Sequence, residues 1–141
     1  MHEKVVVTLS ACALALAACK TNEERCKEAV DQLCERTHEC ATNKDAAWEA
    51  RFGTNVENCK ALLYANPLQA ADPPRQGIAC DKVDTIQKLC SNFGQLYATI
   101  FYDSKAEECR QARAAMSCAD YLGQSTDPNL VPQACNERCT Q

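Results

Sequence analysis

Cysteine is the residue type in this chain with the widest range of chemistry. The sequence holds twelve cysteines in 141 residues, with 46% hydrophobic and 24% charged residues. A cysteine can join another cysteine in a disulfide, ligate a soft metal as a thiolate, or take part in thiol exchange. The compartment and the spacing decide between these uses, because a reducing cytosol keeps thiols free whereas an exported chain forms bridges.

Ten of the cysteines are candidates for structural disulfides. An even number in an exported chain predicts up to five bridges, and the pairing stays open because the sequence does not determine connectivity. The chain after residue 18 is poor in large aliphatic side chains, so bridges are an expected source of stability. The ten candidates are Cys26, Cys34, Cys40, Cys59, Cys80, Cys90, Cys109, Cys118, Cys135 and Cys139.

Two helical spacings are also compatible with a metal site. Cys34 and His38 lie one turn apart, as do Cys135 and Cys139. Zinc and haem sites usually carry C-x-x-C pairs, which do not occur in this sequence, so the spacing favours disulfides and predicts no metal or other cofactor. The alternative is an envelope thiol protein that sequesters a soft metal such as copper.

The sequence offers little for catalysis or for nucleic-acid binding. His38 is the only histidine after the N-terminal segment, and neither a G-x-S-x-G motif nor a glycine-rich phosphate loop occurs. The chain carries 15 Lys and Arg against 19 Asp and Glu, a net charge of −4, so no broad cationic face is expected. We predict that the protein is not an enzyme, has no catalytic residue and does not bind nucleic acid.

The N-terminal segment predicts export. Lys4 precedes an apolar run over residues 5–18, which at about 1.5 Å per residue is too short for a permanent membrane span and fits a signal peptide. The run ends in Leu16-Ala17-Ala18-Cys19, which resembles the lipobox of bacterial lipoproteins, where the cysteine is alkylated by a diacylglycerol and becomes the new N-terminus. The resemblance implies lipidation at Cys19. Cleavage by an ordinary signal peptidase near residues 15–17 is the alternative.

Lipidation implies both a location and a partner. Two or three acyl chains on Cys19 suffice for stable anchoring, so the membrane is the expected partner, with an unidentified envelope protein as a second. By resemblance to enteric lipoproteins, Lys20 after the lipid-bearing cysteine implies sorting to the outer membrane, on its periplasmic or surface face. The domain prediction is a signal peptide at 1–18, a lipidated N-terminus and short tether at 19–22, and one disulfide-stapled helical domain at 23–141.

Helical signals fill the first half of the mature chain. A capping box at Thr21 predicts a helix over about 22–41, with its three cysteines on the buried face. A short helix is expected over 45–52, capped by Gly53. A second capping box at Thr54 predicts a helix that stops before Pro67. Residues 66–79 lack apolar periodicity and predict an exposed connection.

The second half predicts further helices. The strongest amphipathic pattern runs from Val83 to Phe101 and contains Gly94. A third capping box at Ser104 predicts a helix that carries Cys109. A break is expected near Ser117, followed by a short turn, because Cys118 would otherwise face away from Cys109.

An internal repeat links the halves. Cys40 and Cys59 have the same separation as Cys90 and Cys109, and both second cysteines lie in the pattern [Ser/Thr]-x-x-Glu-x-Cys-[Lys/Arg]. The repeat predicts an all-α, small disulfide-rich helical bundle built from two related helical hairpins, over about 23–65 and 80–141. Shared use of common helix caps is the alternative explanation.

The mature part also resembles the small cysteine-rich helical lipoproteins and secreted proteins of myxobacteria. The likeness lies in Cys26-x7-Cys34-x5-Cys40, in Phe-Gly-x-x-Val-Glu-x-Cys59 and in Ser-Cys118-Ala-Asp. It implies a location and an architecture but no catalytic residues. We therefore predict a lipid-anchored cell-envelope lipoprotein that acts as a non-enzymatic structural or interaction module. A binder that uses a cleft between the two hairpins is a further hypothesis.

Overall fold

The computed structural model describes residues 20–141, and the predicted signal peptide and Cys19 lie outside the described residues. The predicted all-α, disulfide-rich fold is confirmed for the described part. Its helices and its two short strands are α2 (Asn22–Cys40), α3 (Ala46–Phe52), α4 (Val56–Ala65), η2 (Pro67–Ala70), η3 (Cys80–Lys82), α5 (Ile86–Asn92), β1 (Ile100–Phe101), α6 (Asp103–Ala115), α7 (Cys118–Gly123), η4 (Pro128–Leu130), α8 (Gln133–Glu137) and β2 (Cys139–Thr140).

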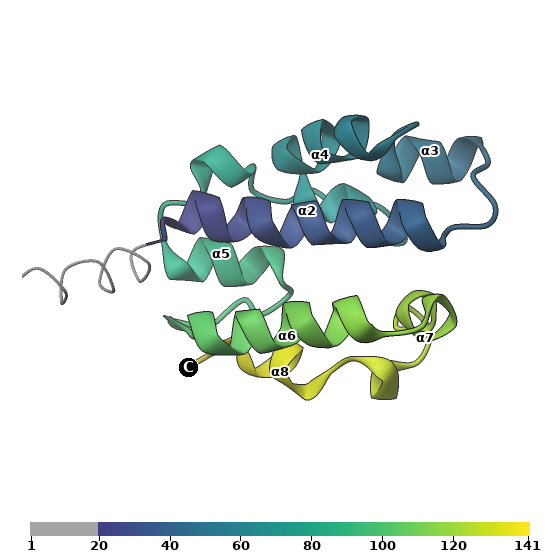
Figure 1. The fold of residues 1–141 in the computed structure, drawn as a ribbon. Coiled ribbons are helices and arrows are strands. Elements are labelled where there is room, and N and C mark those ends of the chain that lie inside the picture. Colours follow the sequence, from purple (N-terminus) through teal and green to yellow (C-terminus); the bar gives the residue numbers. More distant parts are fainter. Residues whose placement is uncertain (1–19) are drawn as a thin grey trace, which may run out of the picture.

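Helix α2 is the central element of the arrangement (Figure 1). Helices α3 and α4 lie along one side of it, and α5 and α6 lie along the other. Helix α7 follows the end of α6 and packs against α2, and α8 packs against α6. The helix begins as predicted, because the Thr21 hydroxyl accepts from the Glu24 backbone N–H while the Glu24 carboxylate accepts from the Thr21 N–H. This reciprocal cap satisfies two N–H groups that no helical carbonyl reaches.

The main hydrophobic core lies between α2, α4, η3 and α5. Leu63 and Leu89 are fully buried, and Val30 and Val83 are each only 4% exposed. Three of these four side chains come from different helices, so burial of their apolar surface holds the elements together. Since Val83 and Leu89 belong to this core, it extends across the boundary expected between the halves.

The long helix predicted from Val83 to Phe101 is wrong. Helix α5 ends at Asn92, where Gly94 adopts φ +82° and its N–H donates to the Ser91 carbonyl, while the Gln95 N–H donates to the Cys90 carbonyl. Both hydrogen bonds are those of a Schellman C-cap, which requires a left-handed residue that glycine supplies at low cost.

The apolar residues beyond this cap do not continue a buried face. Leu96, Tyr97 and Ile100 are 59%, 75% and 43% exposed. Strand β1 instead pairs antiparallel with β2, with Ile100 opposite Thr140 and Phe101 opposite Cys139. The helical periodicity failed here because it does not register a single glycine that ends the helix.

Two of the three predicted capping boxes are also wrong. Helix α4 is capped by Asn55, whose side chain accepts from the Asn58 N–H, and not by Thr54. Helix α6 begins at Asp103, after Tyr102, without a side-chain cap, so Ser104 lies within its first turn. Because the caps of these two helices differ, the shared sequence pattern does not reflect a shared helix start.

The other predicted helix boundaries are confirmed. Asp45 caps α3, and Gly53 follows it with φ +67°. Helix α6 ends at Ala115, and the Ser117 hydroxyl accepts from the Asp120 N–H at the start of α7. After the break, Cys118 is the first residue of α7 and is bound to Cys40 at the end of α2.

The connection over 66–79 is less exposed than predicted. Only its middle, residues 72–76, is exposed, and residues 66–70 are partly buried. The Asn66 side chain accepts from the Gly77 N–H and donates to the Arg75 carbonyl, and the Asn92 side chain bonds both backbone polar groups of Ile78. These side-chain amides replace the backbone hydrogen bonds that an irregular segment lacks.

Candidate functional site

Five disulfides pair all ten of the predicted cysteines. The pairs are Cys26–Cys80, Cys34–Cys59, Cys40–Cys118, Cys90–Cys139 and Cys109–Cys135. Three of them join α2 to η3, α4 and α7, because the three cysteines of this helix face different neighbours along its length. The bridges thus join segments separated by 25 to 78 residues.

The other two bridges hold the C-terminal segment. Cys135 in α8 is bound to Cys109 in α6, and Cys139 in β2 is bound to Cys90 in α5. The pairing does not follow the sequence repeat. Cys59 is joined to α2, an earlier helix in the chain, whereas Cys109 is joined to α8, a later one. Helix α6 packs mainly against α8.

One bridge differs from the rest in its exposure to solvent. Nine of the ten paired cysteines are buried, while Cys118, at the start of α7, is exposed. Its partner Cys40, the last residue of α2, is only 4% exposed.

The residues whose helical spacing is compatible with a metal site make other contacts in the structure. Cys34 is in a disulfide, and His38 Nε2 lies 2.8 Å from the Phe52 carbonyl oxygen, so this nitrogen carries a proton and donates it. The imidazole also stands edge-on to the Trp48 ring at 4.7 Å between centroids. Within residues 20–141, no group of three or more His, Cys, Asp or Glu is arranged to hold a metal ion.

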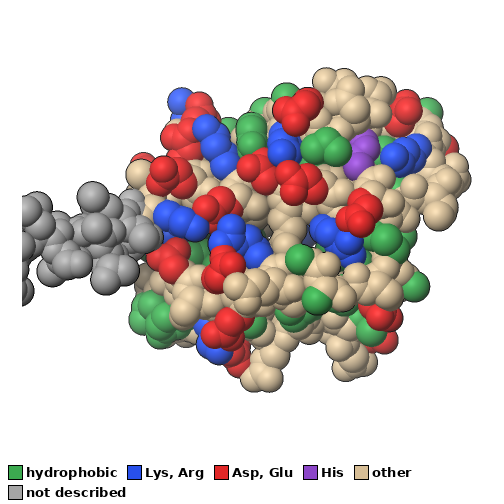
Figure 2. Space-filling model, in the orientation of Figure 1, with side chains coloured by type: hydrophobic (Ala, Val, Ile, Leu, Met, Phe, Trp, Pro, Cys, Tyr) green, Lys and Arg blue, Asp and Glu red, His purple; other side chains and the backbone are tan. Residues whose placement is uncertain are grey.

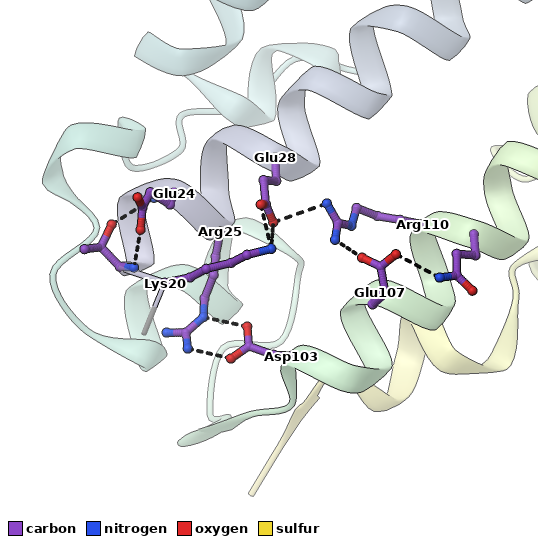
Figure 3. A network of polar contacts seen from close by, with 9 residues as sticks. Lys20, Glu24, Arg25, Glu28, Asp103, Glu107 and Arg110 are labelled. Atoms are coloured by element: carbon purple, nitrogen blue, oxygen red, sulfur yellow. Dashed lines mark hydrogen bonds and ion pairs between the residues drawn. The ribbon is translucent and has the colours of Figure 1, made fainter. Parts of the chain in front are cut away.

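A polar interface joins α2 to α6 (Figure 3). The Arg25 guanidinium donates two hydrogen bonds to the Asp103 carboxylate, at 2.9 and 2.7 Å. Glu28 accepts from Lys20 at 2.7 Å and lies 3.3 Å from Arg110. The Arg25 charge holds the pKa of Asp103 below its ordinary value, because the hydrogen bonds favour the carboxylate.

A partly enclosed cavity of about 40 Å³ lies within this interface. Besides the three basic side chains that pair with Asp103 and Glu28, two further arginines line it, Arg113 from α6 and Arg138 from the end of α8. Figure 2 shows basic and acidic side chains interleaved over the face that α2 and α6 share.

The two additional arginines are held by weak contacts. Arg138 stacks on Phe93, with 3.9 Å from its guanidinium carbon to the ring centroid, and Nη1 lies 3.7 Å from the sulfur of Cys109. Its Nε is shielded from solvent and has no hydrogen-bond partner among residues 20–141. Arg113 donates one hydrogen bond, from Nε to Gln124 at 3.1 Å.

Sequence reasoning did not find this cavity. Its cations come from α2, α6 and the C-terminal segment, and no run or motif marks them. The hypothesis of a cleft between the two halves named no residues. A cavity between α2 and α6 does lie between those halves.

No helix in the described part of the chain is both long enough and apolar enough to cross a membrane. Comparison of the chain with protein families, with curated proteins and with solved structures found no match.

Proposed function

We propose that this protein is a lipid-anchored, extracytoplasmic module of the bacterial cell envelope, non-enzymatic and used for structure or interaction. The observation that carries the proposal is the set of five disulfides, which leaves no free thiol among residues 20–141. Disulfides persist in oxidising compartments and are rare in a reducing cytosol. The likeness of Leu16-Ala17-Ala18-Cys19 to a lipobox supplies the anchor.

The composition of the core supports the same location. Nine of the sixteen buried apolar side chains in the described residues are cysteines, and only a few large aliphatic ones accompany them. Each native disulfide contributes about 2–4 kcal/mol. An interior built so largely from cystine is typical of domains that are exported and oxidised.

The start of α2 supports close attachment to a membrane. Only Lys20 separates Cys19 from Thr21, the N-cap of α2, and the predicted tether continues directly into the helix. Arg25, in the second turn, lies 5.3 Å from the Phe101 ring, and Ile100 and Tyr102, on either side of Phe101, are each 43% exposed. Exposed apolar and aromatic side chains beside an anchor suit the interface between lipid and water.

The test is a Cys19→Ser variant expressed in the native host. We expect the variant to leave the membrane fraction and to lack the mass of the acyl chains, while its five disulfides stay intact. Cys12→Ser is the matched control, because Cys12 lies inside the predicted signal peptide and its loss should leave anchoring unchanged. Retention of Cys19→Ser in alkali-washed membranes would contradict the proposal.

The native protein also tests the alternative function, a thiol protein that sequesters a soft metal such as copper. A fully bridged protein gains ten hydrogen masses on reduction, because each of five disulfides takes up two. A copper-sequestering protein would instead show free thiols when metal-free and would bind cuprous ions without reduction. The measurement is intact mass of the native protein with and without reductant.

A further inference from the structure

The cavity between α2 and α6 holds two cations that lack a counter-ion. Its two acidic groups are already engaged, Asp103 by Arg25, and Glu28 by Lys20 and Arg110. Within residues 20–141, no carboxylate lies within ion-pair distance of Arg113 or Arg138. Both therefore bring an unneutralised charge to the same small space.

Holding these charges without a partner costs free energy. Burial lowers the pKa of Arg113, and it lowers the pKa of Arg138 to about 9, with the nearby charge of Arg113 adding to the second effect. Both guanidinium groups remain protonated at neutral pH. Both side chains are partly buried, and charges shielded from solvent are normally paired, so this unpaired couple points to a site that an anion completes.

The number and geometry of the free donors select the class of anion. The two arginines carry a charge of about +2. A carboxylate or chloride ion would neutralise half of this charge, whereas a phosphate group, at about −1.5 to −2 near neutral pH, would neutralise nearly all of it. Guanidinium forks also match the tetrahedral oxygens of phosphate in pairs. Arg113 and Arg138 both line the cavity, and neither guanidinium is bound to a carboxylate among residues 20–141.

The size of the cavity agrees with such a group. One water position needs about 10–15 Å³ of this kind of space, so a volume of about 40 Å³ holds roughly three oxygen atoms. A phosphate group has four oxygens, so this space is of the right order for one whose fourth oxygen, or an ester substituent on it, lies toward solvent.

We propose that this cavity is a phosphate-binding site in which Arg113 and Arg138 hold the anion. The group is either inorganic phosphate or the phosphate of a lipid headgroup, which share the same recognition chemistry. Arg25, Lys20 and Arg110 contribute positive potential at the rim while remaining bound to Asp103 and Glu28. The site does not depend on lipidation of Cys19.

The first experiment is thermal denaturation of the full mature chain, disulfides intact, in sodium phosphate and in sodium chloride or acetate of equal ionic strength. A ligand at about a hundred times its Kd stabilises the native state enough to raise Tm by roughly 5–10 °C in a domain of this size. We expect this rise in phosphate alone. An equal rise in all three salts would overturn the proposal.

The second experiment uses Arg113→Gln and Arg138→Gln. Each variant should bind phosphate at least tenfold more weakly by calorimetry, and should keep or exceed the unsubstituted Tm in phosphate-free buffer, because a buried charge is gone. Arg75→Gln is the matched control, since Arg75 is exposed and lies outside the cavity. Arg113→Lys keeps the positive charge but loses the planar pair of guanidinium donors. Its affinity for phosphate should therefore lie between that of Arg113→Gln and that of the unsubstituted protein. Unchanged affinity in both Gln variants would overturn the site.

The third experiment separates the two sources of the anion. Inorganic phosphate and glycerol 3-phosphate, which carries the phosphate of a lipid headgroup, are titrated into the same protein. Tighter binding of the glycerol ester indicates a headgroup, and equal or tighter binding of inorganic phosphate indicates the free ion. Failure of both to bind would overturn the proposal, while the envelope location would still rest on the Cys19→Ser result.

Discussion

Removal of the Cys40–Cys118 bridge is expected to lower the free energy of unfolding, mainly because the unfolded chain gains conformational entropy. This bridge spans 78 residues, the longest separation of the five. Closing a free loop of that length is worth about 4.5 kcal/mol in the chain-entropy treatment. The other bridges shorten the path between these two cysteines to roughly half, which lowers the contribution by about 0.6 kcal/mol. The expected loss is therefore about 4 kcal/mol.

This bridge isolates the entropic effect better than the others do. Cys118 is exposed, so alanine in its place removes little packing, whereas Cys40 is 4% exposed and its sulfur fills part of the interior. Cys118→Ala alone keeps the Cys40 thiol in position. The difference between this single variant and Cys40→Ala/Cys118→Ala measures the cavity at Cys40 separately.

The assay is urea denaturation of the three proteins under non-reducing conditions. A net stability of about 5–15 kcal/mol is usual for a domain, so the double variant should still fold. Its unfolding free energy should fall by about 4 kcal/mol, and its m-value should rise, because an unfolded chain with one bridge fewer exposes more surface. A loss below about 1 kcal/mol with a native near-ultraviolet spectrum would refute the reasoning that the bridge restricts the unfolded chain.

Two further predictions concern local structure. Gly53→Ala should lower the free energy of unfolding in urea by more than about 2 kcal/mol, because φ is +67° and a Cβ would lie 2.8 Å from the Cys59 nitrogen. Gly94→Ala, at φ +82° with no atom within 4 Å of the added Cβ, should lower it by about 1 kcal/mol. Equal losses would contradict the steric argument. Burial, with a hydrogen bond to Asp31, raises the pKa of Tyr64 from 10.0 to about 12. The contribution of Tyr64 to stability should therefore be constant below pH 10 and be lost as pH rises from 10 to 12, since the unfolded state loses its proton first. Tyr64→Phe should flatten that fall, as measured by unfolding free energy at each pH, and an unchanged profile would show that Tyr64 is not its source.

The elements that the sequence predicted well are those set by adjacent residues. The capping box at Thr21 and the Ser117 cap of α7 each depend on atoms within a few residues of one another. Such signals act in the same way wherever the segment lies in the fold. The helix breaks after Phe52 and Ala115 followed from the same local chemistry.

The elements that it predicted poorly are those in which local and distant interactions compete. The apolar spacing from Val83 to Phe101 suits a helix, but Gly94 ends α5 and strand pairing with β2 takes over. The third capping pattern fails at Ser104 because α6 begins at Asp103, whose carboxylate is bound by Arg25 on another helix. A pattern read along the chain does not include that ion pair.

The sequence by itself predicted a helical chain in which ten of the twelve cysteines, those after residue 19, are available for disulfides and large aliphatic residues are few. Only the tertiary structure decided which cysteines are joined, because a bridge requires Cα atoms about 5–6 Å apart, and segments up to 78 residues apart meet that condition solely after α2 has gathered its neighbours. The same packing decided the cavity, since Arg113 and Arg138 become a pair of unneutralised charges only when α6 and the C-terminal segment close against α2.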